Sequence, residues 1–318
     1  MSDLSSIDVL AAARLFPAYQ AHLEKTFRFH DRLHEGDAAA FAVVAPRIRA
    51  VACGGESKVP GALIERLPAL EIISVFGVGY DGVDVATAKA RGVMVTHTPN
   101  VLNDEVADTA IGLMLCAARQ LPAADRYVRE GRWLSGPMPL SRKVSGARLG
   151  IVGMGRIGQA IAQRALAFGM TIAYTARSAK AELPYAYHAD VVALAEASDF
   201  LVVITPGGVG TRHLVNARVL EALGPDGILV NVARGSVVDE QALIEALERG
   251  TIAGAGLDVF ADEPRVPERL IALPHVVLAP HIGSATVATR QAMADLAFGN
   301  LRAHFTGQPL LTPVPECR

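Results

Sequence analysis

The stretch Arg148-Leu149-Gly150-Ile151-Val152-Gly153-Met154-Gly155-Arg156-Ile157-Gly158 decides the fold. Its first half is an apolar run typical of a buried strand, and the apolar spacing over 157–165 predicts a helix after it. Three glycines between strand and helix permit a tight turn, close approach of the backbone to a pyrophosphate, and close packing of helix on strand. We therefore expect a dinucleotide to be bound by Gly153, Gly155, Arg156, Ile157 and Gly158.

A second stretch indicates which dinucleotide is bound. An acidic residue ordinarily follows the glycines by about 20 residues and binds the ribose hydroxyls. Here the chain reads Tyr174-Thr175-Ala176-Arg177-Ser178, with no carboxylate to repel a 2′-phosphate. Arg177 supplies a charged, bidentate donor, and Thr175 and Ser178 supply hydroxyls. We expect residues 175–178 to bind NADPH in preference to NADH; in the alternative, Arg177 is a solvated loop residue and NADH is also accepted.

Composition narrows the classes of partner. The 318 residues are 51% hydrophobic, and their formal net charge of -2 gives no electrostatic reason to expect nucleic acid or a charged membrane surface. The longest apolar stretch, 110–118, is well short of the roughly 20 residues that span a bilayer. Asp3 and Asp8 stand where a basic leader would be expected. The three cysteines are far apart and lack metal-ligand spacing, so we expect reduced thiols, no metal and a cytoplasmic location.

The alternation of short apolar runs with helical patterns predicts an α/β fold. Runs at 7–10, 41–44, 71–75 and 93–96 predict strands of a first domain, and runs at 170–174, 200–205, 227–232, 255–259 and 276–279 predict strands around the glycine stretch. Helices are expected at 103–121, ended by Pro122, at 240–249 and at 285–305. We expect two Rossmann-like βα domains: a dinucleotide-binding domain (99–285) inserted into a discontinuous, flavodoxin-like substrate domain (1–98 and 286–318).

Three charged residues follow predicted strands of the second half: Arg234, Glu263 and His281. In an open parallel sheet, ligands bind beyond the carboxyl ends of the strands. Arg234 can hold a carboxylate and polarise a neighbouring ketone, and His281 can supply the proton that hydride addition requires. Glu263 would orient His281 and favour its imidazolium form. Each residue alone is more often a surface or capping group.

Five motifs occur in one order along almost the whole chain. They are Gly77-Val78-Gly79-Tyr80-Asp81, the glycine stretch, Asn231-Val232-Ala233-Arg234-Gly235, Gly256-Leu257-Asp258-Val259-Phe260 with Glu263-Pro264, and Pro280-His281-Ile282-Gly283. In this the chain resembles the D-isomer-specific 2-hydroxyacid dehydrogenases, most of all the glyoxylate/hydroxypyruvate reductases. The resemblance implies the two-domain fold, a nicotinamide cofactor, a homodimer, and catalytic roles for Arg234, Glu263 and His281. It also implies that the backbone N–H groups of Val78 and Gly79 bind the substrate carboxylate.

Further positions take their expected roles from this resemblance. Cofactor contacts are expected at Thr205, Pro206, Thr211, Val232, Ala233, Asp258, His281 and Gly283. Asp258 would contact the nicotinamide amide, the alternative being a strand-end turn. Trp133 matches a motif of the dimer-forming segment, where it either reaches a partner's substrate pocket or packs as an ordinary apolar residue. His97, His188 and His213 are interpreted as ordinary structural or surface histidines.

The leading hypothesis is therefore NADPH-dependent reduction of glyoxylate or hydroxypyruvate to the 2-hydroxyacid. Two alternatives stay open: a phosphoglycerate or other 2-ketoacid dehydrogenase of the same family, and a non-enzymatic, NAD(P)-sensing protein of the corepressor kind. One methylene is worth only about 1–3 kcal/mol of discrimination, so the sequence does not fix the size of the ketoacid.

Overall fold

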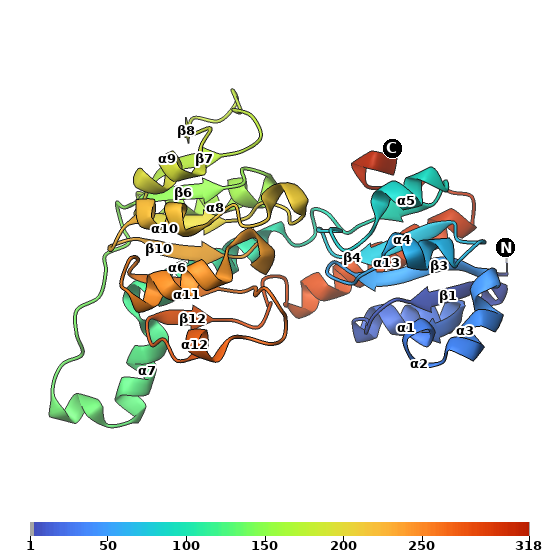
Figure 1. The fold of residues 1–318 in the computed structure, drawn as a ribbon, viewed down its shortest axis with the longest axis horizontal. Coiled ribbons are helices and arrows are strands. Elements are labelled where there is room, and N and C mark those ends of the chain that lie inside the picture. The colour runs from blue at the N-terminus through green and yellow to red at the C-terminus, as the bar shows by residue number, and fades with distance from the viewer. Residues whose placement is uncertain (1–2, 318) are drawn as a thin grey trace. The chain divides into compact units, whose positions relative to one another are not determined.

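The computed structural model describes residues 3–317, which form two compact units. The first unit runs to Leu102 and resumes at Thr286, and the second is Asn103–Ala285 (Figure 1). The first boundary between the units thus lies slightly later than the predicted one, which follows residue 98. Each unit holds one all-parallel sheet, so the predicted α/β class is confirmed. No helix among the described residues is long and apolar enough to cross a membrane.

The first unit is built on a five-stranded parallel sheet in the order β2-β1-β3-β4-β5. Its strands are β1 Asp8–Ala11, β2 Arg28–Asp31, β3 Ile48–Gly54, β4 Ile72–Phe76 and β5 Met94–Thr96. Its helices are α1 Pro17–Thr26, α2 Leu33–Gly36, α3 Ala38–Val44, α4 Gly61–Glu65, α5 Val85–Ala90 and α13 Val287–Phe305. All residues of β1 and β4 are buried, as expected for central strands covered on both faces. The late helix α13 packs on β4, where the Ser74 hydroxyl donates to the Ala297 carbonyl (3.0 Å).

The strand predicted at 41–44 is wrong, because this run is the end of helix α3. Asp37 caps that helix by accepting the N–H of Ala40, and three alanines in the first turn favour the helical state. Phe41 is fully buried while Val43 is exposed, and a run of four apolar residues fits a helix face as well as a strand. Two strands of this sheet were not predicted: β2, a polar edge strand, and β3.

The second unit is built on a seven-stranded parallel sheet in the order β12-β11-β10-β9-β6-β7-β8. The strands are β6 Arg148–Val152, β7 Thr171–Thr175, β8 Ala186–Tyr187, β9 Phe200–Val203, β10 Ile228–Asn231, β11 Gly254–Leu257 and β12 Val276–Leu278. The helices are α6 Asn103–Arg119, α7 Leu121–Arg129, α8 Arg156–Leu166, α9 Val191–Glu196, α10 Ala217–Leu223, α11 Glu240–Glu248 and α12 Glu268–Ile271. The strand order reverses at β6, which is where such sheets bind ligands.

Short 3-10 helices complete the two units. They are η1 Leu4–Ser6, η2 Ala45–Arg47, η3 Arg132–Ser135, η4 Val209–Thr211, η5 Gly235–Val237 and η6 Pro315–Cys317.

The predicted helix that runs to residue 121 and is ended by Pro122 is wrong in its end. Helix α6 ends at Arg119, Gln120 takes a left-handed conformation (φ 51°), and Pro122 lies in the first turn of α7. Proline is tolerated there because the first N–H groups of a helix have no partner within it. In Figure 1, α7 and the chain after it extend away from the sheet of the second unit. We call residues 121–140 the arm.

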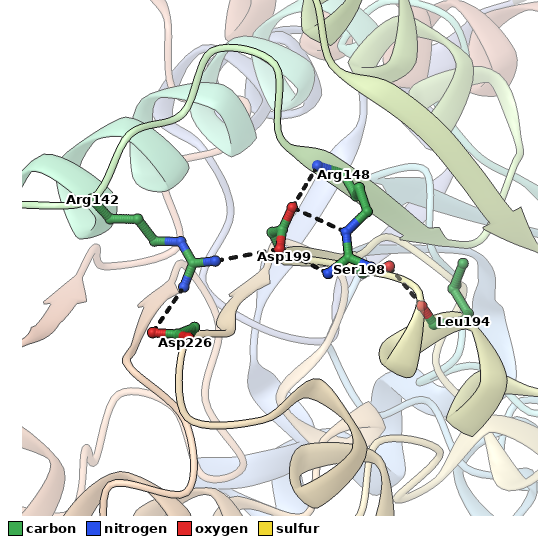
Figure 2. Close-up of polar contacts among 6 residues, drawn as sticks. All are labelled: Arg142, Arg148, Leu194, Ser198, Asp199 and Asp226. Atoms are coloured by element: carbon green, nitrogen blue, oxygen red, sulfur yellow. Dashed lines mark hydrogen bonds and ion pairs between the residues drawn. The ribbon is translucent and has the colours of Figure 1, made fainter.

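The base of the arm is fixed by an ion-pair cluster at the start of β6 and β9 (Figure 2). Asp199 accepts hydrogen bonds from the backbone N–H of Arg148 (2.8 Å) and from its guanidinium (2.9 and 3.2 Å). Arg142, just after the arm, pairs with Asp199 (3.4 Å) and Asp226 (4.0 Å). Its guanidinium also lies 5.6 Å from the ring centroid of Phe200. The arm therefore leaves the sheet from an anchored end.

Candidate functional site

The glycine stretch forms the turn between β6 and α8. Gly155 is the N-cap of α8, so the positive end of the helix dipole and its unpaired N–H groups face this turn. A Cβ on Gly158 would overlap the carbonyl oxygen of Gly153, which explains the third glycine by close packing of helix on strand. The N–H of Gly153 donates to the carbonyl of Thr175 at the end of β7 (3.0 Å). The turn expected to bind the pyrophosphate is thus tied to the segment expected to bind the ribose.

That neighbouring segment is a turn with its charged residue exposed. Thr175 is buried at the end of β7, whereas Arg177 and Ser178 are exposed. The hydroxyl of Tyr174 accepts the N–H of Lys180 (2.7 Å), and the hydroxyl of Tyr187 donates to the carbonyl of Ala176 (3.3 Å). Both bonds fix the backbone that carries Arg177, so its guanidinium stands on a defined turn.

Five further predicted cofactor positions follow β9 and β10, the next two strands beyond β6 in the sheet. Thr205 and Pro206 lie in the loop after β9, and the Thr211 hydroxyl donates to the Pro206 carbonyl (2.7 Å), which closes this loop. Val232 and Ala233 are buried immediately after β10. Carboxyl ends of parallel strands meet at one edge of the sheet, so these loops and the glycine turn share that edge.

His281 and Glu263 form a hydrogen-bonded pair. Nδ1 of His281 lies 2.8 Å from Oε2 of Glu263. The other oxygen, Oε1, accepts the backbone N–H of Phe260 (2.9 Å), which fixes the carboxylate. Because a carboxylate accepts, Nδ1 carries the hydrogen of this bond. Both side chains keep partial access to solvent.

The loop of Arg234 is shaped by a buried asparagine and pressed onto the loop of Glu263. The Asn231 side chain accepts the N–H of Ala233 and donates to the carbonyl of Arg234 (both 3.1 Å). A Cβ on Gly235 would overlap the backbone of Phe260, so only glycine permits this approach of the two loops. Since β10, β11 and β12 are neighbours, Arg234, Glu263 and His281 all follow adjacent strands at one edge of the sheet. This structural role of Asn231 was not predicted, although an asparagine at the end of a buried strand could have indicated it.

Asp258 holds the loop of His281. Its two carboxylate oxygens accept the N–H groups of Ile282 and Gly283 (both 2.7 Å), and its carbonyl accepts the N–H of His281 (2.9 Å). His281 itself has φ 54°, a left-handed conformation that is uncommon for a non-glycine residue and occurs at functional sites. Burial raises the pKa of the Asp258 carboxyl, although the two N–H groups act in the opposite direction. A contact of Asp258 with nicotinamide stays a prediction.

The predicted carboxylate loop, Val78-Gly79, lies in the first unit and follows β4. Within the described part of the chain, the N–H groups of Val78 and Gly79 donate no hydrogen bond. Successive backbone N–H groups in a turn can form a concavity that binds an anion. Binding of a carboxylate by this loop stays a prediction.

Comparison with known proteins places the chain among dehydrogenases. A model of the family "D-isomer specific 2-hydroxyacid dehydrogenase, NAD binding domain" matches residues 111–283. A hydroxyphenylpyruvate reductase of Plectranthus scutellarioides is 48% identical over 98% of this chain and 100% of its own. A glyoxylate/hydroxypyruvate reductase of Arabidopsis thaliana is 52% identical over 84% of this chain and 85% of its own. The crystal structure of an NADPH-dependent glyoxylate/hydroxypyruvate reductase from Sinorhizobium meliloti, with NADP and malonate, superposes with a TM-score of 0.92 (49% identity, covering 98% and 97% of the chains).

Proposed function

The chain belongs to the D-isomer-specific 2-hydroxyacid dehydrogenases, and we propose that it uses NADPH to reduce glyoxylate or hydroxypyruvate to the 2-hydroxyacid. The observation that carries this proposal is the hydrogen bond of 2.8 Å between His281 and Glu263, beside the loop of Arg234. This set supplies a proton donor, its orienting carboxylate and a carboxylate-binding guanidinium, which is what reduction of a 2-ketoacid requires.

The residues present fit NADPH. The glycine turn and the positive end of α8 suit a pyrophosphate, and Gly158 lets strand and helix approach closely. Arg177 and Ser178 are exposed on a fixed turn with no acidic neighbour in 174–178, which suits a 2′-phosphate. The S. meliloti relative with NADP supports the same cofactor here.

Bound NADPH would supply a hydride to the carbonyl carbon of the ketoacid. Arg234 would pair with the substrate carboxylate and polarise the ketone, and the N–H groups of Val78 and Gly79 would hold that carboxylate. His281 would give the proton on Nε2 to the carbonyl oxygen, which balances the hydride and yields a hydroxyl. Glu263 would orient the ring and stabilise its protonated form.

A larger substrate is the second candidate. The hydroxyphenylpyruvate reductase aligns over 98% of this chain, so an aromatic 2-ketoacid would be handled by the same catalytic set. Only the pocket around the substrate side chain would differ.

We also propose that the protein forms a homodimer through the arm. Apolar side chains on the arm are exposed, among them Val128, Trp133, Leu134 (95% exposed) and Leu140. Apolar residues grouped on a surface segment mark interaction sites in soluble proteins. The anchored base at Arg142 would hold the arm in place for a partner subunit.

We place the reaction in the cytoplasm, since the three cysteines are free thiols in the structure, as is usual in a reducing compartment.

The test is oxidation of NADPH, followed by absorbance, with glyoxylate, hydroxypyruvate, hydroxyphenylpyruvate, pyruvate and 3-phosphohydroxypyruvate. We expect the highest kcat/KM with glyoxylate or hydroxypyruvate, and a lower value with NADH in place of NADPH. A maximum with hydroxyphenylpyruvate would favour the second candidate. A maximum with phosphohydroxypyruvate would favour the phosphoglycerate alternative. No oxidation above background with any ketoacid would leave the NAD(P)-sensing, corepressor-like alternative.

A further inference from the structure

The loop of Val78 and Gly79 is held from behind by two consecutive residues. The backbone N–H of Thr98 donates to the carbonyl of Gly77 (2.8 Å), and Nδ1 of His97 lies 2.9 Å from the carbonyl oxygen of Val78. A carbonyl only accepts, so Nδ1 of His97 carries the hydrogen in this bond. His97 thus joins the end of β5 to the turn after β4 through its side chain.

These two carbonyls belong to the same peptide groups as the two N–H groups. The Gly77 carbonyl and the Val78 N–H share one plane, and the Val78 carbonyl and the Gly79 N–H share the next. Both peptide bonds are trans, so the N–H of each peptide group points in the direction opposite to its carbonyl. Since His97 and Thr98 hold both carbonyls on one side, the N–H groups of Val78 and Gly79 face the other side together. A hydrogen bond to a carbonyl also polarises its amide and strengthens the N–H as a donor.

We propose that His97 is a positioning residue for the substrate carboxylate, acting through the Val78–Gly79 peptide. The inference rests on the proposed function, in which this loop binds that carboxylate. Removing the Nδ1–H bond frees the peptide to rotate, so the Gly79 N–H no longer stays in line with the anion. Binding of the ketoacid weakens, while binding of NADPH does not change.

The C-terminal segment holds His97 in place. The Thr312 hydroxyl donates to the His97 carbonyl (2.6 Å), and the His97 N–H donates to the Thr312 carbonyl (3.1 Å). Thr312 is bonded in turn to the side chain of Asn300, a fully buried residue of α13 (2.8 and 3.0 Å). The ring of Tyr80 stands perpendicular to that of His97, with centroids 5.4 Å apart, and its hydroxyl donates to Glu316 (3.1 Å). A ring clamped in this way has one orientation, as a positioning residue needs.

Two variants of His97 separate positioning from packing. Asparagine places an amide nitrogen at the position of Nδ1 and keeps the donor, whereas leucine has the same shape as asparagine without it. For His97→Leu we expect the KM for glyoxylate to rise about tenfold, the size of one lost hydrogen bond in this range, with the KM for NADPH unchanged. For His97→Asn we expect a KM for glyoxylate within about threefold of the wild type, because the donor is rescued.

A binding measurement keeps the test independent of turnover. Oxalate, a dicarboxylate without a reducible ketone, is titrated calorimetrically into the NADP-loaded full-length protein. We expect His97→Leu to weaken oxalate binding about tenfold and His97→Asn to leave it near the wild-type value. If the wild type binds oxalate but reduces no ketoacid, the proposed function fails while the positioning role is still decided by the titration.

The proposal is overturned if His97→Leu and the wild type have equal KM for glyoxylate and equal affinity for oxalate. If the leucine and asparagine variants lose the same amount of affinity for glyoxylate and oxalate, the proposal is overturned too, because the ring then matters only for packing. Failure of the wild type to bind oxalate removes the carboxylate site and the proposal with it. If His97→Leu does not fold, His97→Phe, which keeps a ring but has no donor, replaces it under the same criteria.

Discussion

Nδ1 of His281 lies 2.8 Å from Oε2 of Glu263, while Oε1 of the same carboxylate accepts the N–H of Phe260. The glutamate is therefore fixed by the backbone of its own loop and fixes the histidine in turn. This arrangement orients the imidazole, as the proposed transfer of a proton from Nε2 requires.

Replacing His281 by alanine tests the proton donor. We expect kcat for glyoxylate reduction to fall by about 10²- to 10⁴-fold, the usual contribution of a general acid. In a fluorescence titration, the Kd for NADPH should rise far less than kcat falls, because the glycine turn and Arg177 are unchanged, and this separates loss of chemistry from loss of cofactor binding. Full reductase activity in this variant would show that another group supplies the proton.

Glu263→Gln tests the orienting carboxylate. A neighbouring negative charge favours the protonated imidazole, and the amide removes that charge while keeping the shape. We expect the pH range of ketoacid reduction to narrow, with activity lost at a lower pH than in the wild type. The measurement is the pH profile of kcat/KM, and superimposable profiles for the two proteins would contradict the assigned role.

Arg177→Ala tests the choice of cofactor. A charge-assisted hydrogen bond is worth about 1.5–3 kcal/mol, so we expect the KM for NADPH to rise about 10- to 100-fold. The KM for NADH should stay within about twofold, because NADH has no 2′-phosphate. Arg218, exposed on α10, is a matched control whose replacement by alanine should change neither value. Equal effects of Arg177→Ala on both cofactors would refute the assignment.

Much of the site could be predicted because it lies where a parallel sheet always presents its loops. Arg234, Glu263 and His281 each follow a strand of the same parallel sheet, so their common edge follows from the alternation of strands and helices. The glycine stretch likewise predicts its turn, because close packing of the helix on the strand requires glycines at this spacing.

What the sequence did not show depends on contacts between distant segments. The role of His97 requires knowing that its ring meets Val78, and that Thr312 comes back to bind its backbone. The strand predicted at 41–44 is wrong for a different reason. Four apolar residues fit the periodicity of a helix as well as that of a strand, and the N-cap at Asp37 favours the helix. Pro122 was ambiguous in the same way, because proline both follows helices and begins them.

Leu134→Asp tests the arm as a dimer interface. A carboxylate at this position costs more free energy when it is buried in an interface than when it is exposed to water. We therefore expect the mass measured by light scattering to shift from dimer toward monomer. Val287→Asp, at a residue 90% exposed outside the arm, is the control and should keep the wild-type mass. A wild type that is monomeric at all concentrations would refute the proposed dimer.

Asp199→Asn tests the cluster that anchors the arm and joins β6 to β9. The hydrogen bonds from Arg148 hold the pKa of the Asp199 carboxyl below its usual range, against the opposing effect of burial. A carboxyl with a lowered pKa in the folded state contributes stability above its unfolded pKa and loses it as the pH falls through the folded value. We expect the variant to lose about 1–3 kcal/mol of unfolding free energy at neutral pH, since hydrogen bonds to a charged group are replaced by weaker ones.

The difference in unfolding free energy should be constant from pH 7 to about pH 5 and shrink as the pH falls below the ordinary value of 3.8, where the carboxyl of the unfolded chain becomes protonated. It should vanish once the pH is below the lowered pKa of the folded carboxyl. Urea denaturation at several pH values measures it. Asp226→Asn is the matched control, because Asp226 is 94% exposed and lies 4.0 Å from the same Arg142. An exposed ion pair contributes about 0–1 kcal/mol, so this second variant should differ little from the wild type. If the difference in unfolding free energy between the wild type and Asp199→Asn stays the same down to pH 3, the carboxylate charge is not what stabilises the cluster.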